Sequence, residues 1–153
     1  MPQGGAGRIL NEMCSSRICV DGYGNGEMQG RLYNNYYEEP IVFSNIMQLL
    51  KKMESMFDGF EYPQRTFRAR NFFGVEKKPE KLPARSAQMQ LKPQDECGMV
   101  ATFYVKVIFR KNASWQGNVQ WVNGGQNENF RSIFELLMLM DGVMSGQETE
   151  GKM

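Results

Sequence analysis

The sequence predicts an α+β fold of two duplicated ββα units, with an antiparallel sheet and two helices packed on one face. Three observations support this fold class. Residues 29–57 align without a gap on residues 116–144, at a constant offset of 87. Strand-like alternation precedes both copies, and helix-capping residues occupy equivalent positions in them. The identical pairs are Gln29/Gln116, Gly30/Gly117, Phe43/Phe130, Ile46/Ile133, Leu49/Leu136, Leu50/Leu137 and Met53/Met140.

The first repeat is predicted as a hairpin followed by an amphipathic helix. Residues 17–22 and 27–34 are its strands, and the glycine-rich stretch between them supplies the turn. Asn45 and Gln48 have the spacing of a capping box, which places the start of the helix near Asn45. Its apolar stripe covers one face of the sheet. The stripe consists of Ile46, Leu49, Leu50, Met53 and Phe57.

The second repeat has the strongest strand of the chain, residues 100–110, and then a second strand, residues 115–122. Ser132 and Glu135 repeat the capping box before a helix that is apolar on nearly all sides. The first helix has Lys51 and Lys52 where the second has Met138 and Leu139. We therefore expect Met138 and Leu139 to form a helix interface with a partner or with a second copy of the chain.

Length and composition indicate one compact domain. The chain has 153 residues, of which 41% are apolar and 23% charged. Its predicted parts are a flexible arm (1–16), the first repeat (17–60), a basic connecting segment (61–99), the second repeat (100–146) and a flexible tail (147–153). There is no apolar run of about 18 residues and no signal-peptide core, which predicts a cytoplasmic protein without a membrane partner.

The connecting segment concentrates positive charge. Residues 64–92 contain eight basic and two acidic residues, a net charge of +6 in a chain whose total is +1. Interleaved phenylalanines resemble a strip that contacts nucleic acid, and a charged protein partner would be attracted in the same way. The candidate binding residues are Arg65, Arg68, Arg70, Phe72, Lys77, Lys78, Lys81 and Arg85.

Catalytic and metal chemistry find little support in the sequence. The chain has no histidine, which is the commonest general base near neutral pH and the commonest metal ligand. Its three cysteines include no CxxC pair. We therefore expect a protein that is not an enzyme and that holds no metal or cofactor.

The last third of the chain resembles a known group of proteins. Residues 113–122, 124–126, 130–132 and 135–141 are similar to a recurrent pattern in small uncharacterised proteins of mobile genetic elements of gut Firmicutes. The resemblance implies a setting in which small proteins often inhibit host defence, as anti-CRISPR proteins do. The predicted function is a non-enzymatic protein-binding module that inhibits a host defence nuclease. The alternative is a nucleic-acid-binding protein that uses residues 64–92.

Overall fold

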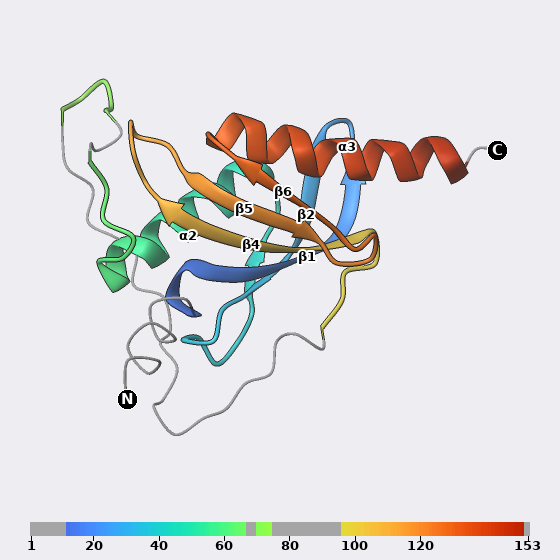
Figure 1. Cartoon of the computed structure of the whole chain (residues 1–153), viewed down its shortest axis with the longest axis horizontal. Helices are drawn as coiled ribbons and strands as arrows, with labels where there is room; N and C mark the ends of the chain where they lie inside the picture. Colours follow the sequence, from blue (N-terminus) through green and yellow to red (C-terminus); the bar gives the residue numbers. More distant parts are fainter. Residues whose placement is uncertain (1–11, 67–69, 75–95, 152–153) are drawn as a thin grey trace.

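The computed structural model describes residues 12–66, 70–74 and 96–151 of the chain (Figure 1). It confirms the predicted α+β class, with an antiparallel sheet and helices packed on one face. The elements, in chain order, are β1 (Ser15–Gly24), β2 (Glu27–Tyr33), β3 (Ile41–Phe43), α2 (Ile46–Phe60), β4 (Ala101–Phe109), β5 (Gln116–Trp121), β6 (Gln126–Phe130) and α3 (Ile133–Gly151).

The six strands form one sheet in the order β3-β2-β1-β4-β5-β6, and every neighbouring pair is antiparallel. Each half therefore contributes three strands, where the sequence predicted two. The outer strands escaped prediction because β3 has only three residues, and β6 reads QNENF, without apolar alternation. Regular structure also extends into the segments predicted as a flexible arm (1–16) and a flexible tail (147–153). β1 begins at Ser15, and α3 continues to Gly151.

The two halves share one pairing register at the offset of 87 residues. Four pairings show it: Ile18 with Leu32, Val105 with Val119, Gly30 with Phe43, and Gly117 with Phe130. The register shifts after Val20 in β1 and after the equivalent Val107 in β4. At the joint between the halves, Arg17 of β1 faces Tyr104 of β4, its own equivalent. That the halves superpose as duplicated units stays a prediction.

Both helices cover the same face of the sheet, where alternate strand residues form a single core. Phe57 of α2 packs edge-on against the buried Trp115, at a centroid distance of 5.7 Å. Val119, the fourth residue of β5 and on the same face as Trp115, borders a cavity that Leu139 of α3 also lines. Leu49, Met53 and Met56 of α2, and Leu136, Met140 and Met144 of α3, are buried in this core.

The predicted capping boxes are present at both helix starts. Asn45 Oδ1 accepts a hydrogen bond from the Gln48 N–H at 2.8 Å, and Ser132 Oγ accepts from the Glu135 N–H at 3.1 Å. The side chains of Gln48 and Glu135 accept in turn from the backbone N–H groups of Ser44 and Arg131. Each cap satisfies N–H groups that the first helical turn would leave unpaired.

Each helix also forms a polar contact with a strand of the other half. Glu54 of α2 binds Arg110, at the end of β4, at 3.1 Å. Asp141 of α3 accepts a hydrogen bond from the hydroxyl of Tyr23 in β1. Glu54 and Asp141 are equivalent at the offset of 87, and so are Tyr23 and Arg110. Arg110 also pairs with Asp58 at 2.8 Å, while its side chain is only 3% exposed.

The repeated glycines have a steric cause. A Cβ atom on Gly30 would lie 1.9 Å from the carbonyl oxygen of Cys19, and one on Gly117 would lie 1.9 Å from that of Lys106. Those two carbonyls are themselves equivalent at the offset of 87. Because each clash is with backbone, no rotamer change relieves it. The glycine of the Gln-Gly pair that marks both copies is thus required by the close approach of the adjacent strand.

We predict that Gly30→Ala and Gly117→Ala each lower the free energy of unfolding by about 1–3 kcal/mol or more, because a neighbouring strand must shift. Gly59→Ala is the matched control, since nothing lies within 4 Å of its Cβ position in α2. It should leave stability unchanged or raise it by about 0.5–1 kcal/mol. Urea denaturation measures all three. Equal stability of the three variants would contradict the steric explanation.

Candidate functional site

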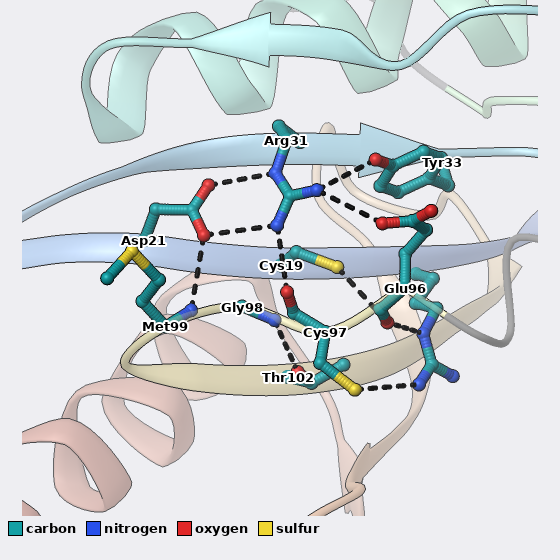
Figure 2. Close-up of polar contacts among 10 residues, drawn as sticks. Cys19, Asp21, Arg31, Tyr33, Glu96, Cys97, Gly98, Met99 and Thr102 are labelled. Atoms are coloured by element: carbon teal, nitrogen blue, oxygen red, sulfur yellow. Dashed lines mark hydrogen bonds and ion pairs between the residues drawn. The ribbon is translucent and has the colours of Figure 1, made fainter.

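The face of the sheet opposite the helices carries mainly polar side chains, at positions that alternate with the core. They come from the four central strands and are Ser15, Arg17, Cys19, Arg31, Tyr33, Thr102, Tyr104, Lys106, Asn118 and Gln120. Residues 96–99 lie against one end of this face (Figure 2). We call it the open face.

Arg31 forms hydrogen bonds that hold residues 96–99 against the sheet (Figure 2). Its guanidinium forms a bidentate pair with Asp21, at 2.9 and 3.1 Å, and donates to the carbonyl of Cys97 at 2.8 Å. Further contacts reach the hydroxyl of Tyr33 at 2.9 Å and the carboxylate of Glu96 at 3.4 Å. Bidentate arginine pairs are strong and directional, so this network fixes where the chain re-enters the sheet.

The charges in this network stabilise one another. The hydrogen bonds from Arg31 are the main cause that lowers the pKa of Asp21 below its usual value, and the N–H of Met99 adds to the effect. Hydrogen bonding to Asp21 also raises the pKa of Arg31. Burial raises the pKa of the nearby Cys19 thiol, although Arg31 and Arg17 oppose that shift. Cys19 therefore remains a neutral thiol at neutral pH.

Arg17 lies at the centre of the open face and has a different set of partners. Its Nε donates to the carbonyl oxygen of Glu96 at 2.5 Å, and Nη2 has a long contact of 4.0 Å with the sulfur of Cys97. In the part of the chain that the structure describes, no carboxylate lies within ion-pair distance of Arg17. The residue is only 7% exposed.

A pocket of about 360 Å³ opens beside Arg17 on this face. It collects side chains from both halves of the sheet and from the turn after β2. The lining residues are Ser15, Arg17, Tyr33, Asn34, Asn35, Tyr104, Gln120 and Val122. Nearly all of them can form hydrogen bonds, so the pocket suits a polar ligand.

A second pocket, of about 370 Å³, lies on the helical face between α3 and strands β5 and β6. Its floor is apolar, with Phe103, Val119 and Trp121 opposite Leu139 and Val143. The indole nitrogen of Trp121 is buried without a hydrogen-bond partner. Leu139 lines this pocket and packs against the core, so it faces the sheet. This differs from its predicted place at an outward-facing interface.

The predicted helix interface is present in part. Met138 is 52% exposed, and Phe134, one turn earlier on α3, is 72% exposed. Phe134 was missed because spacing alone did not separate it from the core residues beside it. The equivalent positions in α2 are Met47, which is also exposed, and Lys51.

The structure describes only some of the candidate binding residues of the basic connecting segment. Arg65 pairs with Asp58 at 2.8 Å, so its charge is already engaged within the fold. Arg70 and Phe72 are exposed. Arg68, Lys77, Lys78, Lys81 and Arg85 lie outside the described residues. Binding of nucleic acid or protein by this segment stays a prediction.

Comparison of the chain with protein-family models, with curated proteins and with solved structures finds no match. Among the described residues, no three or more acidic or cysteine side chains are grouped so as to hold a metal ion. The described helices include none with the length and apolar character needed to cross a membrane. The cytoplasmic location stays a prediction.

The Asp21–Arg31 pair predicts a defined pH dependence. Because the pKa of Asp21 is lowered in the folded state, its contribution to stability is present above the usual pKa of about 4 and is lost as the pH falls through the folded value. The stability difference between wild type and Asp21→Asn should stay constant from about pH 7 to pH 5 and shrink below about pH 4.

Urea denaturation at a series of pH values measures this difference. Glu39→Gln is the control, because it removes an exposed carboxylate that forms no ion pair within the described structure. A difference between wild type and Asp21→Asn that is unchanged down to about pH 2 would contradict the assignment.

Proposed function

We propose that the chain is a non-enzymatic protein-binding module whose contact surface is the outer side of α3. The supporting observation is the exposure of two large apolar side chains, Phe134 and Met138, on successive turns of this helix. Residues four apart lie side by side on a helix, so the two form a continuous strip. Leu137, which is half-buried, flanks the strip.

Covering the sheet does not require this strip. Leu136, Met140 and Met144 already provide the inner side of α3. The equivalent helix α2 also covers its own half of the sheet. At the outward positions that match Phe134 and Met138 it has Met47 and Lys51. The stronger apolar character of α3 therefore serves something other than the common fold. Aromatic and methionine side chains are enriched at protein interfaces, which makes a protein the partner that fits best.

The charged side chains beside the strip already have partners within the chain. Arg131 pairs with Glu135 at 2.8 Å, and Asp141 binds the hydroxyl of Tyr23. An apolar strip bordered by charged groups that already have partners resembles the centre of a protein-binding surface more than a surface that attracts its partner by charge. That the partner is a host defence nuclease stays a prediction, because no contact described here bears on its identity.

The test compares changes at matched positions of the two helices. Tagged wild type, Phe134→Glu/Met138→Glu and Met47→Glu/Lys51→Glu are used for affinity capture from cells of the natural host, with quantitative mass spectrometry. A partner should be recovered by wild type and by the α2 variant, and reduced about tenfold or more with the α3 variant, as expected for interface hot spots.

Light scattering during size exclusion shows whether the partner is a second copy of the chain, in which case the α3 variant alone becomes monomeric. Thermal unfolding confirms that both double variants fold. Equal recovery by the α3 variant, or a loss confined to the α2 variant, would contradict the proposed surface.

A further inference from the structure

The open face contains a buried positive charge that the described fold does not neutralise. Arg31, one strand away, has the carboxylates of Asp21 and Glu96, whereas Arg17 has a backbone carbonyl and a sulfur. A buried charge costs several kcal/mol unless it is paired, so cations of this kind in proteins normally have an anion beside them. Glu96 does not fill this place, because its carboxylate points to Arg31 and is half-exposed.

The surroundings of Arg17 increase the positive potential. Lys106 lies on the same face of the adjacent strand and forms no ion pair with any described residue. The Cys19 thiol is held neutral by burial and supplies no negative charge. Arg17 is one of the residues that line the pocket, and its Nη1 has no hydrogen-bond partner within the described chain.

We propose that the pocket beside Arg17 binds the carboxylate or phosphate group of a small organic anion. The planar guanidinium presents parallel N–H groups that match two oxygens of either group. Tyr104 and Gln120, from the opposite half of the sheet, line the same pocket and can donate further hydrogen bonds. The ring of Tyr104 is partly exposed and offers a surface for a flat group next to the anion.

The size of the pocket favours a small molecule. About 360 Å³ lies within the range of small-ligand sites and holds an anion with one ring attached. The site is independent of the proposed protein-binding surface, because α3 packs on the opposite face of the sheet. Failure of either proposal therefore leaves the other standing.

Nuclear magnetic resonance of the Arg17 side chain tests the proposal. The Nε–H of Arg17 is hydrogen-bonded to Glu96, which slows its exchange and makes it observable. Phenyl phosphate and benzoate are titrated at constant ionic strength, with uncharged benzyl alcohol as the reference. At least one anion should shift the Arg17 resonance in a saturable way, benzyl alcohol should not, and the stronger probe identifies phosphate or carboxylate as the preferred group.

Three variants assign the effect to the pocket. Because Arg17→Met removes the Arg17 resonance, binding to every variant is followed at the backbone amide of Tyr104, which lines the same pocket. Arg17→Met should weaken binding of the stronger probe about tenfold or more, as expected when a charge-assisted hydrogen bond is lost. Arg131→Met removes the same charge from the exposed start of α3 and should change it less than twofold. Gln120→Trp fills the pocket from an exposed strand position and should also abolish binding, which covers the case in which Arg17→Met does not fold.

Absence of saturable binding by both anions would overturn the proposal. So would binding that persists within twofold in Arg17→Met, or in Gln120→Trp where Arg17→Met does not fold.

Discussion

The pairing of β1 with β4 is the constraint on which the rest of the structure depends. Without it, each half would be a three-stranded sheet with a long inner strand left as an unpaired edge. The joint makes one sheet wide enough for both helices, and it brings the equivalent residues Arg17 and Tyr104 face to face. Contacts from Glu54 to Arg110, and from Asp141 to Tyr23, then tie each helix to the opposite half. The two halves thus complete one core.

The sequence predicted the features that local patterns determine. Both hairpins, both helices and both capping boxes follow from turn residues, periodicity and cap spacing, and these agree with the structure. The glycines at 30 and 117 were recognised as a repeat, but their cause lies in a neighbouring strand. The contact of Glu54 with Arg110 could not be predicted, because its counterpart joins Asp141 to a tyrosine. All four residues occupy equivalent positions, but only the two carboxylates are alike in chemistry, since an arginine in one copy corresponds to a tyrosine in the other.

The candidate sites were predictable to a smaller extent. The apolar character of Met138 is visible in the sequence, whereas the packing of Leu139 toward the sheet depends on the rotation of α3. Arg17 appeared as an ordinary charged residue at the start of a strand. Its backbone partner is the carbonyl of Glu96, 79 positions away, which no local pattern brings beside it. In both places the candidate site arises where equivalent positions differ: Met138 against Lys51, and Arg17 against Tyr104.

Native-state hydrogen exchange of the full chain tests most directly whether the β1–β4 joint unites the two halves. If it does, the amides of β1 and β4 should form the slowest class together and exchange only through global unfolding. Under increasing urea their opening free energies should fall with the same slope. Exchange of β1 together with β2 and β3, well before β4 and with a smaller slope, would show that the halves open separately and would contradict this account.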